Sequence, residues 1–151
     1  MRLVLDSSVL IASVKPDEPA HDSARAFVER ARPASSTGAV QVFAPPELWL
    51  EVHVVEQRLA RSRRAAPVTE RALQGWTIEL VAPAELAAIT DFLDLLEKRM
   101  RGRRPFANAT DLVYLWVAWR KDATVVTLDH GMLDYHGVVC DLTRPQHVRI
   151  G

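Results

Sequence analysis

The chain begins with MRLVLDSSVL, residues 1–10, in which an apolar run ends directly at an acid. Leu3, Val4 and Leu5 form the kind of short apolar run that a buried strand shows, and residues 9–12 predict a short helix behind it. Asp6 therefore marks the point where a buried strand gives way to a helix. An acid in this place is the first candidate for a functional group.

Strands and helices alternate along the rest of the sequence. Strands are predicted at residues 40–44, 77–81 and 123–128, and residues 138–140 and 148–150 compete for a fifth. Helices are predicted over residues 20–32, from Pro45-Pro46 onward, from Thr69, over residues 83–100, and from Asn108 or Thr110 to about residue 120, with breaks at 33–38 and 101–105. This alternation implies crossover connections. We therefore expect an α/β fold, with a central, mainly parallel sheet of four or five strands and helices on both faces.

Length and composition describe one globular domain. The chain has 151 residues, of which 48% are hydrophobic and 25% are charged, so we expect a single domain over residues 1–151. Nineteen Lys and Arg residues balance nineteen Asp and Glu residues. The formal net charge of zero therefore gives no general argument for nucleic-acid binding.

The sequence also bears on the compartment. Cys140 is the only cysteine, which excludes an intrachain disulfide and fits a reducing environment. The acid at residue 6 comes too early for the apolar region of a signal peptide. The longest apolar run, residues 112–119, is far shorter than the ~20 residues of a membrane helix. We therefore expect a cytoplasmic protein without a membrane segment.

Four acids are expected at one edge of the sheet, outside the C-terminal ends of its strands, where sites form in open parallel sheets. Asp6 and Asp129 directly follow predicted strands. Asp111 lies at the start of the helix that leads into the fourth strand, so the N-terminus of this helix lies at the same edge. Glu51 lies in the first two turns of the helix that leaves the second strand. The topology alone thus predicts that the four acids converge.

A shared site of four carboxylates is electrostatically costly, because like charges raise one another's proton affinity. Hard divalent cations with oxygen ligands relieve this cost, and Mg²⁺ or Mn²⁺ suits a set made only of carboxylates. Such ions generate hydroxide from water and neutralise the charge that develops on a phosphodiester. The pattern therefore indicates metal-dependent hydrolysis of phosphodiester bonds.

Each acid also has a purely structural interpretation. Asp6 is equally consistent with capping the helix behind it, and Asp129 with a turn or a helix cap. Asp111 suits the dipole of a first helical turn, although its neighbours three and four residues on lie along an apolar face. Glu51 lies at the edge of the buried stripe of its helix. The shared edge, rather than any single acid, is the argument for function.

Four segments of the chain resemble, in order, the acidic motifs of PIN-domain nucleases, and in particular of VapC-type toxins. These segments are VLDSSVL at residues 4–10, Pro46 followed by Glu51-Val52, ATDLVYL at residues 109–115, and VVTLD at residues 125–129. The resemblance spans almost the whole chain. It implies a three-layer α/β/α PIN-like domain that hydrolyses RNA as an endoribonuclease. It further implies a homodimer, inhibited by a small antitoxin whose tail enters the acidic pocket.

The resemblance also implies roles for individual residues. One or two Mg²⁺ or Mn²⁺ ions would be held by Asp6, Glu51, Asp111 and Asp129. Ser7 takes a place often filled by threonine, and its hydroxyl, or that of Ser8 or Thr127, would orient a carboxylate or a water. His53 stands near the place where relatives often carry an asparagine. Two further acids whose part in the site is left open are Glu47 and Asp134.

Basic residues gather in two stretches that flank the predicted ligand helices, and they are candidates for phosphate contact. These are Arg58, Arg61, Arg63 and Arg64 in one stretch, and Lys98, Arg99, Arg101, Arg103 and Arg104 in the other. The alternative is a solvated helix end, where Arg and Lys are favourable in any case. Trp49 is either a stacking platform for an unpaired base or part of the core.

Two rival functions stay open. A catalytically inactive PIN-like module would bind RNA or protein without cleaving, and would lack metal binding. A phosphotransfer domain would form adducts on Asp6, although a dehalogenase-like enzyme normally has a second acid where Ser8 stands. Nucleotide-binding glycine loops, paired zinc-ligand histidines and a GxSxG motif are all absent from the sequence.

Overall fold

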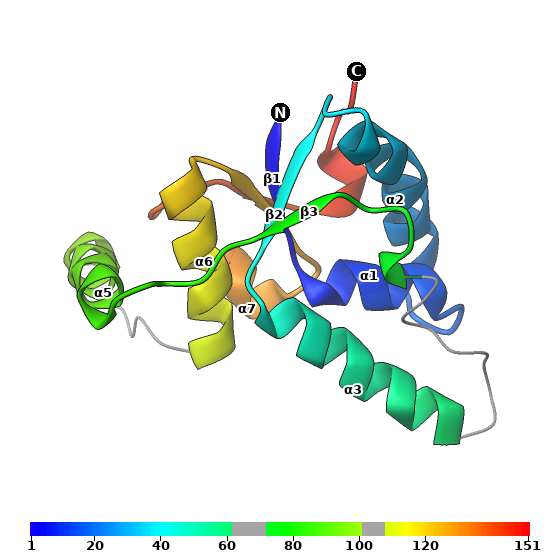
Figure 1. Ribbon diagram of the computed structural model, residues 1–151, viewed down its shortest axis with the longest axis horizontal. Coiled ribbons are helices and arrows are strands. Elements are labelled where there is room, and N and C mark those ends of the chain that lie inside the picture. Colours follow the sequence, from blue (N-terminus) through cyan, green and yellow to red (C-terminus); the bar gives the residue numbers. More distant parts are fainter. Residues whose placement is uncertain (62–71, 101–107) are drawn as a thin grey trace.

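A parallel sheet forms the centre of the molecule (Figure 1). The computed structural model describes residues 1–61, 72–100 and 108–151. Within these residues the sheet has five strands in the order β3-β2-β1-β4-β5, and all four pairings are parallel. The strands are β1 (Arg2–Leu5), β2 (Gln41–Ala44), β3 (Ile78–Leu80), β4 (Thr124–Val126) and β5 (Leu142–Thr143).

The first strand lies in the middle of the sheet. Leu3 is paired with Val42 of β2 on one side and with Thr124 of β4 on the other. Successive side chains of a strand point to opposite faces. Leu3 and Leu5 therefore pack into one hydrophobic cluster and Val4 into another, each with an exposed fraction of 3% or less. The segment that opens the chain is thus the part of the sheet around which both layers of the core assemble.

Helices cover both faces of the sheet (Figure 1). The cluster of Leu3 and Leu5 includes residues of α1 (Ser7–Val14), α2 (His21–Ser36) and α3 (Glu47–Arg61). The cluster of Val4 includes residues of α5 (Leu86–Met100), α6 (Ala109–Lys121) and α7 (His130–Leu133). A short 3-10 helix, η1 (Pro145–His147), follows β5. The predicted three-layer α/β/α architecture is confirmed.

Both ends of α6 are set by local sequence. The Asn108 side chain accepts a hydrogen bond from the Thr110 backbone N–H at 3.0 Å and so caps the N-terminus. Asp122 ends the helix in the left-handed conformation, with φ at 50°, which short polar residues tolerate. Since β4 follows at once, the start of α6 lies at the edge of the sheet where β4 ends.

Two predicted helix boundaries are wrong. Helix α2 runs through Pro33 to Ser36 instead of ending at residue 32. Its last turn is held because the buried Ser35 hydroxyl donates to the Arg32 carbonyl at 2.7 Å and accepts the Thr77 N–H at 3.1 Å. Helix α5 begins at residue 86 rather than 83. The Val81 N–H still pairs with β2 at 2.9 Å, so the chain needs further residues to turn.

The fifth strand is neither of the two predicted segments. It is β5, whose position is fixed by backbone hydrogen bonds from Val125 N–H to the Asp141 carbonyl at 2.9 Å and from Thr127 N–H to the Thr143 carbonyl at 3.0 Å. Cys140 makes only an isolated bridge, and Val148 packs into the cluster beneath α2. The helix predicted from Thr69 begins outside the described residues, and the predicted break at 101–105 lies outside them.

Candidate active site

Asp6 is buried at the end of β1, with an exposed fraction of 5%. Its Oδ2 accepts hydrogen bonds from the Ser8 hydroxyl at 2.5 Å and from the Thr127 hydroxyl at 2.6 Å. Asp6 is the N-cap residue of α1, but its side chain makes no capping hydrogen bond to that helix. The carboxylate is therefore oriented by hydroxyl groups from two segments instead of serving as a helix cap.

The two hydroxyl groups are themselves held by backbone groups. The Ser8 Oγ accepts the Leu128 N–H at 3.1 Å, and the Thr127 Oγ1 accepts the Asp129 N–H at 2.9 Å. Ser8 and Thr127 thus link the Asp6 carboxylate to the loop that leaves β4. Burial raises the pKa of Asp6; the hydrogen bonds from Ser8 and Thr127 oppose this rise, and the charge of Glu51 adds to it.

Asp111 lies in the first turn of α6 and is partly buried. Partial burial, followed in order by the negative charges of Asp129, Asp6 and Glu51, raises its pKa from 3.8 to about 6. An electrostatic influence from all three acids requires that they lie near Asp111. The structure therefore brings the four predicted acids together from four separate segments.

Glu51 lies in the second turn of α3 and is held from the other face of the sheet. Its Oε2 accepts a hydrogen bond of 2.6 Å from the Tyr114 hydroxyl. Tyr114 is 1% exposed and stands three residues after Asp111 on α6. Burial and the bond to Glu51 raise the pKa of the Tyr114 hydroxyl, so it stays a donor. Sequence reasoning treated Tyr114 only as part of an apolar face, although its spacing from Asp111 was the available signal.

Asp129 caps a helix and also belongs to the group of acids, as its two interpretations predicted. It is the N-cap of α7, where its Oδ1 accepts the Met132 N–H at 3.0 Å. It is also exposed, and its charge raises the pKa of Asp111 more than the charges of the other two acids. Capping therefore fixes the carboxylate beside the other acids without removing it from them.

The remaining candidates differ in their exposure. Ser7 is buried and interacts with the Tyr114 hydroxyl. His53, Glu47 and Asp134 are exposed. The described basic candidates, all exposed, are Arg58, Arg61, Lys98 and Arg99. Arg63, Arg64, Arg101, Arg103 and Arg104 lie outside the described residues.

The donor set suits a hard divalent cation, because it consists of carboxylates supported by hydroxyl groups. Within residues 1–61, 72–100 and 108–151, no three His, Cys, Asp or Glu side chains are arranged so that they hold a metal ion as they stand.

Among the helices of these residues, none combines the length and the apolar composition that a bilayer crossing requires.

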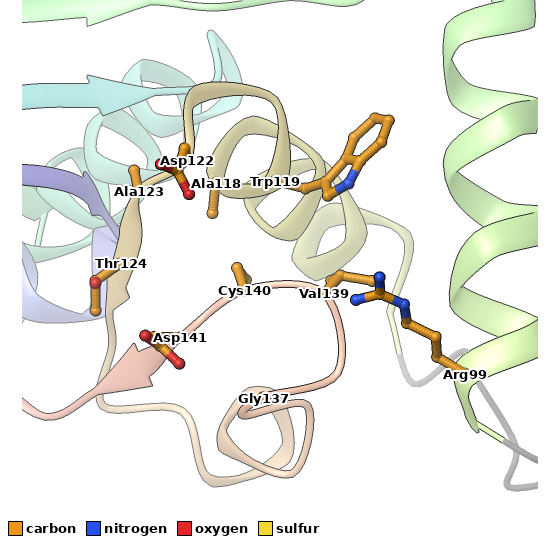
Figure 2. A pocket seen from close by; sticks show the side chains of 10 residues that line it. All are labelled: Arg99, Ala118, Trp119, Asp122, Ala123, Thr124, Gly137, Val139, Cys140 and Asp141. Carbon is orange, nitrogen blue, oxygen red and sulfur yellow. The ribbon is translucent and has the colours of Figure 1, made fainter.

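A separate cavity of about 500 Å³ lies at the opposite edge of the sheet, where β4 begins (Figure 2). It is lined by Arg99 of α5, Trp119 and Asp122 at the end of α6, and Cys140 and Asp141 before β5, among others. Burial, with a contribution from Asp141, raises the pKa of Cys140 to about 12. The thiol therefore stays protonated near neutral pH, and the cavity offers no activated nucleophile.

Comparisons with known proteins agree with the topology. No family model matches the sequence, and no curated protein matches it. Among solved structures, the chain is similar to one from the VapBC2 complex of Rickettsia felis, crystallised with a DNA fragment from its promoter. The TM-score is 0.66 at 13% identity, and the match covers 95% of this chain and 98% of that one. It is also similar to PAE2754 from Pyrobaculum aerophilum, with a TM-score of 0.57 at 16% identity, over 93% and 92% of the two chains.

The chain has a VapC-type PIN-domain fold. The match extends over nearly the full length of both neighbours, and it includes the parallel sheet with helices on both faces. A shared fold does not by itself carry a shared activity. The chemistry open to this chain therefore depends on its own acids and their surroundings.

Proposed function

We propose that this chain is a Mg²⁺- or Mn²⁺-dependent endoribonuclease that hydrolyses RNA phosphodiester bonds, acting in the cytoplasm as the toxin of a toxin–antitoxin pair. One observation carries the proposal. The four acids come from four segments that are linked by hydrogen bonds. Thr127 binds both the Asp6 carboxylate and the Asp129 N–H, and Tyr114, three residues after Asp111, binds Glu51. A bound divalent cation would remove most of the repulsion among these carboxylates.

Asp6, Glu51, Asp111 and Asp129 would hold one or two ions. Bound Mg²⁺ or Mn²⁺ supplies an activated water and a positive charge that balances the charge developing on the phosphodiester. The part of the chain itself is to fix the carboxylates before the substrate arrives. Ser8 and Thr127 both bind Asp6 Oδ2, so the orientation of that carboxylate is set from two sides.

The remaining acids are fixed in different ways. Glu51 cannot turn freely, because its Oε2 is bound by the buried hydroxyl of Tyr114. Asp129 is held by the first turn of α7. Asp111 binds protons more readily than an ordinary aspartate, since its pKa is raised to about 6. A bound cation would lower this pKa again, because it favours the charged form of the carboxylate.

An exposed apolar face on α3 supports a protein partner. Trp49, Leu50 and Val54 have exposed fractions of 45%, 65% and 38%. Large apolar side chains that gather on one exposed surface are typical of interaction sites. The structural neighbour from Rickettsia felis belongs to a complex named VapBC2. We therefore include a small antitoxin, and a second copy of this chain, among the proposed partners.

The test is cleavage of a labelled single-stranded RNA by the purified chain, with Mg²⁺, with Mn²⁺ and with EDTA. We expect cleavage only with metal, and a loss of about 100-fold or more in Asp6→Asn. Asp141→Asn is the matched control, because Asp141 is exposed at the opposite edge of the sheet. Calorimetric titration with Mn²⁺ and circular dichroism of each variant separate loss of metal binding from loss of folding.

The rival functions give different results. A folded chain that binds RNA but neither binds Mn²⁺ nor cleaves would be an inactive module. A stable beryllofluoride adduct on Asp6 would instead indicate a phosphotransfer domain. Co-purification with the product of an adjoining short reading frame, lost on mutation of Leu50 to Asp, would support the antitoxin part of the proposal.

A further inference from the structure

Arg144 lies at the same edge of the sheet as the acids. It directly follows Thr143, the last residue of β5, whose carbonyl accepts the Thr127 N–H at 3.0 Å. Thr127 is the residue whose hydroxyl binds Asp6. The backbone of Arg144 therefore directly follows the residue that pairs with Thr127.

The side chain of Arg144 contacts the element that carries Asp129. Its Nη2 lies 3.1 Å from Nδ1 of His130, the first residue of α7 and the neighbour of Asp129. The same Nη2 lies 3.5 Å from Nε2 of His130, so the guanidinium group is held against the imidazole ring. The ion pairs found among the described residues do not include Arg144. A permanent positive charge is thus held against α7, next to the residue that follows Asp129.

Three of the predicted basic residues that the structure describes are less well placed for a substrate at this edge. Arg58 and Arg61 stand seven and ten residues after Glu51 on the same helix, about 10 and 15 Å along its axis. Arg99 lines the cavity at the opposite edge, and its Nη1 donates to the Val138 carbonyl at 2.8 Å. Arg144 is therefore better placed than these three for a substrate at the acidic edge.

We propose that Arg144, oriented by His130, binds a phosphate of the RNA strand adjacent to the bond that is cleaved. The inference rests on the proposed nuclease function. The RNA strand is polyanionic, and phosphates beyond the proposed metal site would still require a positive group to hold them. Arginine suits this place because its charge is permanent and its fork matches two phosphate oxygens.

The first experiment measures binding of a fluorescent single-stranded RNA in EDTA as a function of KCl concentration. We expect Arg144→Gln to weaken binding about 3- to 10-fold and to lower the salt slope by about 0.7, the value for one lost phosphate contact on a single strand. Arg144→Lys is expected to keep the slope. The matched control is Arg120→Gln, an exposed residue near the C-terminal end of α6 at the opposite edge, with binding expected within about twofold of wild type.

A second variant tests the orienting role of His130. We expect His130→Ala to weaken binding less than Arg144→Gln does and to leave the salt slope unchanged, because the charge of Arg144 remains. A Michaelis–Menten series with Mg²⁺ is expected to show the Arg144→Gln loss mainly in KM. Circular dichroism and thermal unfolding confirm that each variant is folded.

The outcomes separate this inference from the function on which it rests. Metal-dependent cleavage by the wild type, with an unchanged salt slope in Arg144→Gln, would overturn the role of Arg144 and leave the nuclease assignment intact. A salt slope in Arg144→Lys that is as low as in Arg144→Gln would also count against a phosphate contact, because lysine keeps the positive charge. A wild type that neither binds nor cleaves RNA would overturn both.

Discussion

The two edges of the sheet both carry aspartates, but the surroundings of these aspartates differ. Where the strands end, Asp6 is buried under two hydroxyl groups, and Glu51 is held by Tyr114. Where the strands begin, Asp122 and Asp141 are exposed at the cavity in Figure 2. The chemistry open to a carboxylate therefore depends on the groups that orient it and on the charges near it.

Helix direction explains part of this difference. Helices α1, α6 and α7 begin at the edge with the buried acid, where the positive ends of their dipoles favour negative charge. The opposite edge receives the C-terminal end of α6, whose carbonyl groups disfavour a buried carboxylate. In a parallel α/β sheet, the connections also diverge at the C-terminal strand ends and leave space for a ligand.

The sharpest test of this comparison uses the two ends of α6. Asp111→Asn should lower metal-dependent RNA cleavage by about 100-fold or more, because it removes one of four proposed metal ligands. Asp122→Asn should leave cleavage within about twofold, and asparagine tolerates the left-handed conformation at this position. The measurement is the initial rate of RNA cleavage. Equal effects of the two substitutions would refute a functional difference between the edges.

A smaller effect is expected from the group that holds Glu51. Tyr114→Phe removes the 2.6 Å hydrogen bond but keeps the ring in the core, so we expect cleavage to fall about 10-fold. Stability should fall by about 1 kcal/mol. Rates and denaturant unfolding of Tyr114→Phe, Glu51→Gln and the double variant form a cycle. Strictly additive losses in this cycle would argue against a positioning role for Tyr114.

The smallest effect concerns stability and pH in the absence of metal. The pKa of Asp111 is about 6 in the folded chain and 3.8 in the unfolded one, so the folded state binds the proton more tightly between these values. The free energy of unfolding should therefore fall as pH rises from about 4 to about 6. The fall attributable to Asp111 should be on the order of 1 kcal/mol, because solvent screens a half-exposed group.

Urea unfolding in EDTA across this pH window measures the effect. Asp111→Asn should lose this part of the pH dependence and be more stable than wild type above about pH 6, while Asp122→Asn should follow the wild type. Addition of Mg²⁺ at neutral pH should stabilise the wild type and not Asp111→Asn. Superimposable pH curves for wild type and Asp111→Asn would contradict the crowding of charge at this site.

The sequence was most informative where a buried strand or a helix has a clear local pattern. The run before Asp6, the Asn108 cap and the helix leading into β4 are all confirmed, because apolar periodicity and capping are local signals. The two-residue strand β5 has too few residues for a pattern, so sequence reasoning chose the wrong segments for it. Arg144 was not predicted as a candidate for the same reason, because it directly follows this short strand.

The continuation of α2 through Pro33 was missed for another reason. A proline inside a helix normally predicts its end, but here Ser35 ties the last turn to the segment before β3. A hydrogen bond between residues 42 positions apart leaves no trace in a local pattern. Tertiary contacts outweighed local preference at this place.

The sequence by itself determined the alternation of strands and helices and placed four acids at the ends of elements that meet at one edge. Only the tertiary structure decided which groups hold them: Thr127 binds Asp6 from 121 residues away, Tyr114 binds Glu51 across 63, and Arg144 reaches His130 across 14. Backbone periodicity is encoded between near neighbours, whereas these contacts depend on strand register and helix packing, which form only when the whole sheet is assembled.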